Sequence, residues 1–231
     1  MLTENQQFNL LLLDKCGYDL EKATKCQRFV MGSEHPCQSP AQHLNNDKMY
    51  DEGIYICYKD GANAPFDADL QKENIRGIGL VVGSHSLCIA LRNAGEYTLT
   101  NKEDSTGGCR YIPDWDEARM DFNGMSNWEH IKKIGTDITL ADGEYIPALG
   151  ELMLIGIFKH AINEALEWAN GELFEDDWYW SSTEYSSTNA WRLYLGSMYQ
   201  YYGTKAQGQR LVRPVSAFTL SATLHLFNPW C

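Results

Sequence analysis

Alternation of apolar and polar residues predicts short strands on both sides of a helical centre. Residues 54–59 alternate ahead of the turn signal Asp60-Gly61, and residues 79–82 and 87–91 flank the polar run Gly83-Ser84-His85-Ser86. A polar, glycine-containing turn between two β-prone runs is typical of a hairpin. Three more short strands are predicted toward the carboxyl end, at residues 178–181, 190–195 and 210–217.

Apolar residues at helical spacing predict helices between these groups of strands. Residues 115–120 and 127–134 each carry apolar side chains three positions apart, and a longer helix begins near Pro147. Its apolar residues keep a period of about 3.6 to Leu166, and Asn170-Gly171 ends the run. This order of elements predicts the α+β class, with two helices packed on short, mostly antiparallel strands whose ends pair in one sheet.

The domain organisation follows from where the periodicity is strong. Residues 1–49 have weak periodicity and a run rich in Ser, Pro and Gly, so we expect an appendage there. Residues 50–218 form the predicted domain, and residues 219–231 a C-terminal extension. No apolar run reaches the roughly 20 residues of a membrane-spanning helix, so we expect no membrane insertion.

The net charge limits which kinds of partner are expected, and the cysteines indicate the compartment in which the protein is made. A net charge of −12 disfavours a nucleic-acid partner, because phosphate binding needs clustered Lys and Arg. No positive charge precedes the short apolar patch near the start and no small-residue cleavage site follows it, so no classical signal peptide is expected. Seven cysteines, odd in number and irregularly spaced, predict reduced thiols and synthesis in a reducing cytoplasm.

Three motifs that suggest chemistry are better explained as structure. The glycines of Gly77-Ile-Gly79-Leu-Val-Val-Gly83 lie in a strand pattern with no helix after them, unlike a nucleotide-binding loop. The two Cys and two His of residues 26–43 lack the paired spacing of zinc ligands. Cys88 lies between apolar residues with no visible charge to lower its pKa, so we expect a core thiol. We therefore expect no catalytic residue, metal or cofactor.

Large and charged residues near the carboxyl end are expected to build the domain. Trp180 and Trp191 lie on predicted strands, and an indole there more often fills a core than binds a ligand. Arg213, among apolar residues, is expected to be half buried and paired with Glu184 or Glu151.

Tyrosines are concentrated in residues 178–218, between constant-looking bulky residues. Six of the thirteen tyrosines lie between positions 179 and 202. Tyrosine gives a large, rather rigid contact area at low entropic cost, and contiguous exposed aromatic surface marks a contact site. We expect exposure of Tyr194, Tyr199, Tyr201 and Tyr202, because a buried strand would carry larger aliphatic residues there. The simpler alternative is an ordinary solvent-facing loop.

Seven segments share a pattern with a known family. They are Asp60-Gly61, Ile78-Gly79-Leu-Val-Val, Asp121-Phe-Asn-Gly124, Tyr145-Ile-Pro-Ala-Leu-Gly-Glu151-Leu, Tyr179-Trp-Ser-Ser-Thr-Glu184-Tyr, Asn189-Ala-Trp191 and Arg210-Leu-Val-Arg-Pro-Val-Ser-Ala-Phe218. Together they resemble the variable proteins of diversity-generating retroelements over most of residues 53–218. The resemblance implies a C-type-lectin-like fold related to formylglycine-generating enzymes.

In that family, copying by a reverse transcriptase randomises adenines, so selected codons diversify and the resulting surface binds a ligand. The resemblance implies a variable region at about residues 180–218 that binds a protein or glycan on a target cell. A phage receptor-binding protein fits this interpretation. Such a protein would lie on a virion or a cell surface, and it could form homo-oligomers. The implied ligand-binding positions are Thr188, Arg192, Tyr194, Ser197, Met198, Tyr199, Tyr201, Tyr202, Gly203, Thr204, Ala206, Gly208 and Leu211, bordered by Ser186, Ser187 and Asn189.

Two other functions stay open at this point. One is a structural virion or surface protein whose lectin-like domain packs against neighbours. The other is an enzyme of the formylglycine-generating type, but residues 178–218 contain no cysteine to act as its active-site thiol. The Glu-Pro-Asn and Gln-Pro-Asp triplets of calcium-dependent lectins are also absent, so the resemblance implies ligand display and not catalysis.

Overall fold

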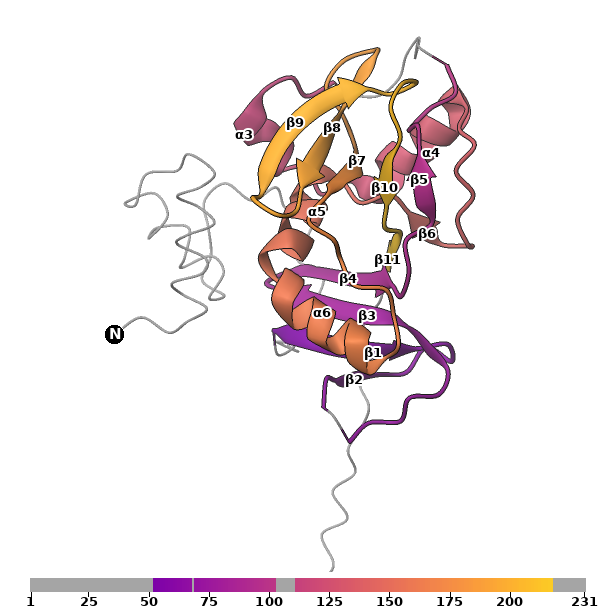
Figure 1. Ribbon diagram of the computed structural model, residues 1–231, viewed down its shortest axis with the longest axis vertical. Coiled ribbons are helices and arrows are strands. Elements are labelled where there is room, and N and C mark those ends of the chain that lie inside the picture. The colour runs from indigo at the N-terminus through magenta and orange to yellow at the C-terminus, as the bar shows by residue number, and fades with distance from the viewer. Residues whose placement is uncertain (1–51, 68, 103–110, 218–231) are drawn as a thin grey trace, which may run out of the picture.

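The computed structural model describes residues 52–67, 69–102 and 111–217, which form a mixed α+β domain with two sheets (Figure 1). The first sheet has six strands in the order β2-β1-β3-β4-β11-β6. Its strands are β1 (Gly53–Tyr58), β2 (Asn63–Pro65), β3 (Ile75–Val82), β4 (His85–Ala90), β6 (Glu144–Tyr145) and β11 (Val215–Ala217).

The second sheet has five strands in the order β5-β10-β7-β8-β9, so β9 is an edge strand among the described residues. Its strands are β5 (Gly95–Tyr97), β7 (Trp178–Glu184), β8 (Asn189–Tyr194), β9 (Tyr199–Thr204) and β10 (Arg210–Val212). Only the β10–β7 pair is parallel among the described strands, with Leu211 opposite Tyr179. The expected α+β class with mostly antiparallel strands is confirmed.

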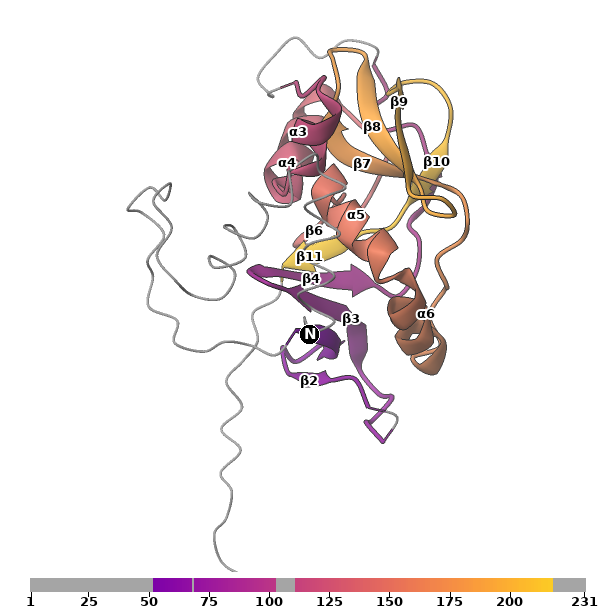
Figure 2. The same cartoon turned by 90° about the vertical axis from the view of Figure 1, so that its left-hand side faces the viewer.

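Four described helices pack against the inner faces of these sheets. They are α3 (Trp115–Arg119), α4 (Gly124–Ile134), α5 (Leu149–Ile157) and α6 (Lys159–Trp168). α4 and α5 contact β7, while α6 contacts β1 and β3. Figure 2 shows α5 and α6 following one another from the second sheet to the first. One continuous apolar core therefore joins the two sheets, and it includes buried residues from α5, β3 and β8.

Two predicted elements are divided in the structure. The predicted helix of residues 147–166 is split at Phe158, which ends α5 and precedes α6. The predicted strand of residues 210–217 is split by Arg213-Pro214, because proline has no amide to donate to a ladder. Its two halves enter different sheets, and β11 pairs with β4, so the two ends of the domain do meet in one sheet.

Some expectations fall outside the described residues. These are the appendage at 1–49, the extension at 219–231 and the Cys and His residues Cys26, His35, Cys37 and His43. In the part of the chain that the structure describes, no helix has the length and apolar character needed to span a bilayer.

A buried polar cluster connects β7 to the starts of α4 and α5. The Asp121 carboxylate accepts hydrogen bonds from Thr183 Oγ1 at 2.7 Å and from Asn127 Nδ2 at 2.8 Å. The same Thr183 oxygen accepts from the amide of Leu149 at 2.8 Å. Asp121 and Thr183 are both buried, so each bond satisfies a group that water cannot reach. The cluster sets where the helices sit against the sheet.

Glu151 forms the neighbouring part of this cluster. Its carboxyl accepts from the amide of Ala148 at 2.7 Å and from the hydroxyl of Tyr145 at 3.2 Å. Gly124 lies against it so closely that a Cβ there would be 2.2 Å from Glu151 Oε2. Burial, reinforced by the charge of Asp121, raises the pKa of Glu151 from 4.5 to about 7, against the two hydrogen bonds that lower it.

Glu151→Gln is expected to change how stability depends on pH. The raised pKa means that the folded state holds the Glu151 proton more tightly than the unfolded state does, so this contribution is present below about pH 4.5 and is lost as pH rises through 7. The loss is on the order of 3 kcal/mol at most. Urea unfolding at pH 4.5 and pH 8 should show a smaller difference for the glutamine variant. An unchanged difference would contradict the assignment.

Candidate ligand-binding surface

Strand alternation on β8 and β9 separates a buried side from an outer side. On β8, Trp191 and Leu193 are fully buried. Arg192 and Tyr194, which alternate with them, are half-buried. On β9, Gln200 is buried and its neighbours Tyr199 and Tyr201 are 51% and 38% exposed. The period of two thus places polar and aromatic side chains on the face away from the core.

Strand pairing aligns the outer side chains in rows across the sheet. Trp178 on β7 lies opposite Tyr194 on β8, which lies opposite Tyr199 on β9. Trp180, Arg192 and Tyr201 form the next row in the same order. Cross-strand neighbours on one face are close enough to contact, so these rows form a continuous surface.

The tyrosine rings of this surface stack on one another. Tyr199 and Tyr201 have centroids 6.1 Å apart with an interplanar angle of 16°, and Tyr201 and Tyr202 are 4.8 Å apart at 12°. Tyr202 stacks in turn on Tyr185 at 4.0 Å and 14°. Trp178 contacts Tyr199 edge-on at 6.0 Å. Mutual contact orders these rings before any ligand arrives.

Trp115 on α3 adds an aromatic side chain that the sequence did not assign to the surface. It is 37% exposed, and its ring lies 6.5 Å from both Tyr199 and Tyr201. The buried amide of Gln200 holds α3 there, because it donates to the Trp115 carbonyl at 3.1 Å and accepts from Arg119 Nε at 2.5 Å. No sequence signal links α3 to β9, since this contact depends on the tertiary fold. We call Trp115, Trp178, Arg192, Tyr194, Tyr199, Tyr201 and Tyr202 the aromatic face.

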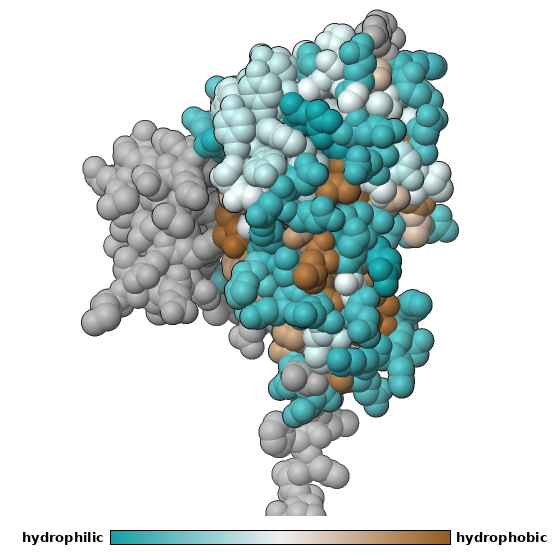
Figure 3. All heavy atoms as spheres, in the orientation of Figure 1, coloured by the Kyte–Doolittle hydropathy of each residue, from teal (hydrophilic) through white to brown (hydrophobic). Residues whose placement is uncertain are grey.

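Most of the other expected positions are also at least partly exposed. Thr188, Ser197 and Gly208 are exposed, and Gly203, Thr204 and Ala206 are half-buried. In Figure 3 the surface over β8 and β9 is pale, as expected for Tyr, Trp, Ser and Gly, which are intermediate in hydropathy. Ser186, Thr188 and Asn189 form their own hydrogen-bonded turn at one end of β8.

Two expected positions depart from this pattern. Leu211 is only 9% exposed and belongs to the core, because β10 lies between β5 and β7 and Leu211 faces the same way as buried Tyr179. Met198 is half-buried and packs toward α5, where a Cβ on Gly156 would be 2.5 Å from its sulfur. For Leu211 the expectation of an outward side chain is wrong.

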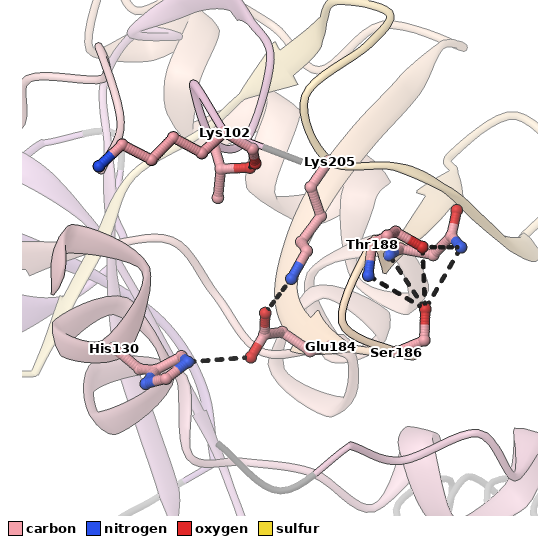
Figure 4. A network of polar contacts seen from close by, with 8 residues as sticks. Lys102, His130, Glu184, Ser186, Thr188 and Lys205 are labelled. Atoms are coloured by element: carbon pink, nitrogen blue, oxygen red, sulfur yellow. Dashed lines mark hydrogen bonds and ion pairs between the residues drawn. The ribbon is translucent and has the colours of Figure 1, made fainter. Parts of the chain in front are cut away.

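The far end of β9 is held by a buried ion pair. Lys205 Nζ bonds Glu184 Oε1, and both side chains are almost completely buried. His130 Nε2 lies 3.4 Å from the other oxygen of Glu184. Figure 4 shows Lys205 and His130 reaching the two oxygens of this carboxylate from different sides. The backbone of Lys205 also accepts from Leu99 N at 2.8 Å and donates to Thr188 O at 2.9 Å. Lys205 therefore fixes the turn that follows the tyrosine strand.

Arg213 has different partners from those expected. It is 1% exposed, and it donates to Asn93 Oδ1 at 2.8 Å and to the carbonyls of Ala90 and Glu172 at 3.1 and 2.8 Å. Neither Glu184 nor Glu151 is its partner. The expectation failed because a guanidinium between two strand ends finds backbone carbonyls there, which sequence spacing does not reveal. Its expected structural role is consistent with this position.

The two strand tryptophans fill the core, as predicted. Trp180 is 1% and Trp191 0% exposed. The indole nitrogen of Trp180 donates to the Tyr97 carbonyl at 2.8 Å, and that of Trp191 donates to the Ile112 carbonyl at 2.7 Å. Trp191 therefore supports the second sheet from its inner side, whereas Trp180 is buried on the same side of the sheet as Arg192.

Cys88 is a buried thiol next to a second one. Cys57 and Cys88 are each 2% exposed and both are free, so the core position expected for Cys88 is confirmed. A hydrogen bond from Cys57 and the charge of Arg76 lower the pKa of Cys88 to about 7, although burial opposes this. The absence of charged neighbours expected from the sequence is thus wrong, since Arg76 comes from the adjacent strand.

Two hollows of the described surface lie away from the aromatic face. One of about 430 Å³ is lined by residues that include Lys59, Arg92 and Glu144, and one of about 330 Å³ by residues that include Met125 and Trp128. Within residues 52–67, 69–102 and 111–217, no group of three or more His, Cys, Asp or Glu side chains is placed to hold a metal. The aromatic face itself is thus suited to contact another surface more than to enclose a small molecule.

Comparison with known proteins gives one informative similarity. No family model and no curated protein matches the chain. A crystal structure of a fimbrial protein from Bacteroides ovatus ATCC 8483 is similar in fold, with a TM-score of 0.55 and 17% sequence identity. The similarity covers 73% of this chain and 49% of that one, so the chain spans about half the length of the fimbrial protein.

Lys205→Met is expected to destabilise the fold by about 3–5 kcal/mol, because it leaves the buried Glu184 carboxylate without its cation. Glu184→Gln combined with Lys205→Met should recover much of this loss, because no buried charge then lacks a partner. Urea denaturation of the single and double variants measures both effects. Additive losses in the double variant would show that the pair is not energetically coupled.

Proposed function

We propose that this protein is a ligand-display protein whose aromatic face binds a macromolecule on a cell surface. In this proposal the domain is C-type-lectin-like and related to the variable proteins of diversity-generating retroelements. The observation that carries the proposal is the stack of tyrosine rings along β9, in which Tyr199 and Tyr201 share the outer side of the strand and are exposed. A chain that exposes such side chains together gains nothing for its own core, and such patches mark contact sites.

The buried contacts that hold β9 in place support binding through a preorganised surface. Gln200, the second residue of β9, holds the start of the strand to α3, and Lys205 holds the following turn to β7. Rings that are already ordered lose little conformational entropy when a ligand binds. The side chains on the outer face can therefore differ without disturbing the buried contacts below them.

A structural surface protein is the second candidate. The observation that favours it is the similarity in fold to a fimbrial protein. In that case the aromatic face would pack permanently against a neighbouring subunit and would be the same in every copy of the gene. The phage virion and the cell surface remain the proposed locations in either case.

Tyr199→Ala with Tyr201→Ala is expected to weaken binding strongly and leave the fold intact. The two side chains are 51% and 38% exposed, so the free energy of unfolding should change by only about 1 kcal/mol. Removal of two interface tyrosines should weaken binding by about thirtyfold or more. Flow cytometry with the fluorescently labelled protein on a panel of bacterial strains measures this. Tyr202 is left in place because it packs on Trp191.

Met125→Ala with Leu173→Ala is the matched control. Both residues are 42–48% exposed, and neither belongs to the aromatic face. Equal loss of cell labelling in the control and in the tyrosine variant would contradict a role for the face. If the tyrosine variant labelled cells as strongly as the wild type does, the proposed role of the aromatic face would be contradicted directly.

Sequencing of the gene across one population should separate display from permanent packing. Display predicts substitutions at Tyr199, Tyr201 and Arg192, with none at Gln200 or Lys205, because the latter two are buried and bonded. A neighbouring reverse transcriptase gene and a near-copy of the 3′ coding region are expected as well. Uniform residues at the outer positions would favour the structural candidate.

A further inference from the structure

Two arginines share the outer face of the second sheet. Arg192 lies on β8 between buried Trp191 and Leu193, and it is opposite Trp180 of β7. Arg210 lies on the other side of β7, one residue before Leu211, which is paired with Tyr179 and buried. Alternation along each strand therefore turns both guanidinium groups to the side that carries Tyr199 and Tyr201.

Packing holds Arg192 in place on this face. Its guanidinium carbon lies 4.4 Å from the centre of the Trp178 ring, a cation–π contact. The absence of a side chain at Gly203 leaves room for it, since a Cβ there would be 3.3 Å from the guanidinium carbon. Burial first, and then the positive charge of Arg210, lower the pKa of Arg192. The two like charges are thus close enough to repel each other.

Neither arginine has an acidic partner among the described residues. The ion pairs there use other cations, and the Nε atoms of both arginines are buried without a hydrogen bond. Arg210 donates through Nη1 to the neutral carbonyl of Gln209, so its charge still has no acidic partner. This is notable in a chain with 31 acidic and 19 basic residues. An unpaired, partly desolvated cation costs free energy, and a carboxylate supplied from outside would remove that cost.

We propose that Arg192 and Arg210 receive a carboxylate from an acidic side chain of the partner protein, with the tyrosines packing around it. The planar guanidinium is suited to two parallel bonds with a carboxylate. Trp, Tyr and Arg are also the residues enriched at protein–protein hot spots, and the hollows that would suit a small molecule lie elsewhere. The inference rests on the proposed function and names the chemistry of its ligand.

A displayed library of random peptides, selected on the full 231-residue chain, tests the inference. The peptides recovered should be enriched in Asp and Glu. The best one, made synthetically, should lose about tenfold or more in affinity when its acidic residues become Asn or Gln, because each lost charge pair is worth at least that factor. Raising the salt concentration should weaken its binding.

Arg192→Gln with Arg210→Gln should reduce the affinity by a similar factor. Arg76→Gln with Lys133→Gln removes the same charge from exposed positions outside the aromatic face and should leave the affinity nearly unchanged. Arg192→Lys with Arg210→Lys keeps the charge but not the planar fork, so it should bind with intermediate affinity. Thermal unfolding of each variant shows whether it is folded. If the glutamine variant does not fold, the affinity of the lysine variant tests the role of the arginines instead.

The outcomes separate this inference from the proposed function. Peptides that need Tyr199 and Tyr201 but show neither acidic enrichment nor dependence on the arginines would overturn the inference and leave the aromatic face as a binding site. Recovery of no peptide that needs the tyrosines would overturn both. Arginine-dependent binding of a sulfated heparin oligosaccharide, without acidic peptides, would show that the partner is a polyanionic glycan and would overturn the assignment to a protein.

Discussion

The ordered surface depends on one buried ion pair between Lys205 and Glu184. β9 is an edge strand, so one side of its backbone has no neighbouring strand in the described domain to hold it. Lys205 fixes the turn after β9 through its side chain to β7 and through its backbone to Leu99 and Thr188. A buried charge pair stabilises little by itself, but breaking it is costly, which makes it a specific lock on one arrangement. The positions of the tyrosine side chains on the outer face follow from the position of β9.

The same division between inner and outer residues extends through the domain. Asp121, Thr183 and Glu151 tie the helices to β7 by hydrogen bonds that are all satisfied inside the fold. Arg213 does the same between the two sheets with carbonyl partners. In contrast, the buried Nε atoms of Arg192 and Arg210 on the outer face have no hydrogen-bond partner. Buried polar groups are normally satisfied, so a partner that bonds these two guanidinium groups would remove the cost of leaving their Nε atoms without a hydrogen bond.

The sequence predicts secondary-structure elements and their buried faces better than it predicts which side chains contact one another in the fold. The strands at 54–58 and 79–82, the helix predicted from Pro147 and observed from Leu149, and the core positions of Trp180 and Trp191 follow from local patterns. β9 was not predicted, because its alternation is of Tyr with Gln and not of apolar with polar residues. The partners of Arg213 and the approach of Trp115 depend on long-range packing. Local patterns carry no information about such contacts.

The stacking of the tyrosines limits what kind of recognition the face supports. Rings 4.0 to 6.1 Å apart at angles of 12 to 16° already satisfy part of their contact area against one another. A partner therefore gains less apolar burial per ring but loses little entropy in binding, so selectivity has to come from directional groups. On this face the charged groups without an acidic partner are the guanidinium groups of Arg192 and Arg210, whose Nε atoms also lack a hydrogen bond. Shape and rigidity would thus come from tyrosine, while discrimination between partners would come from charge.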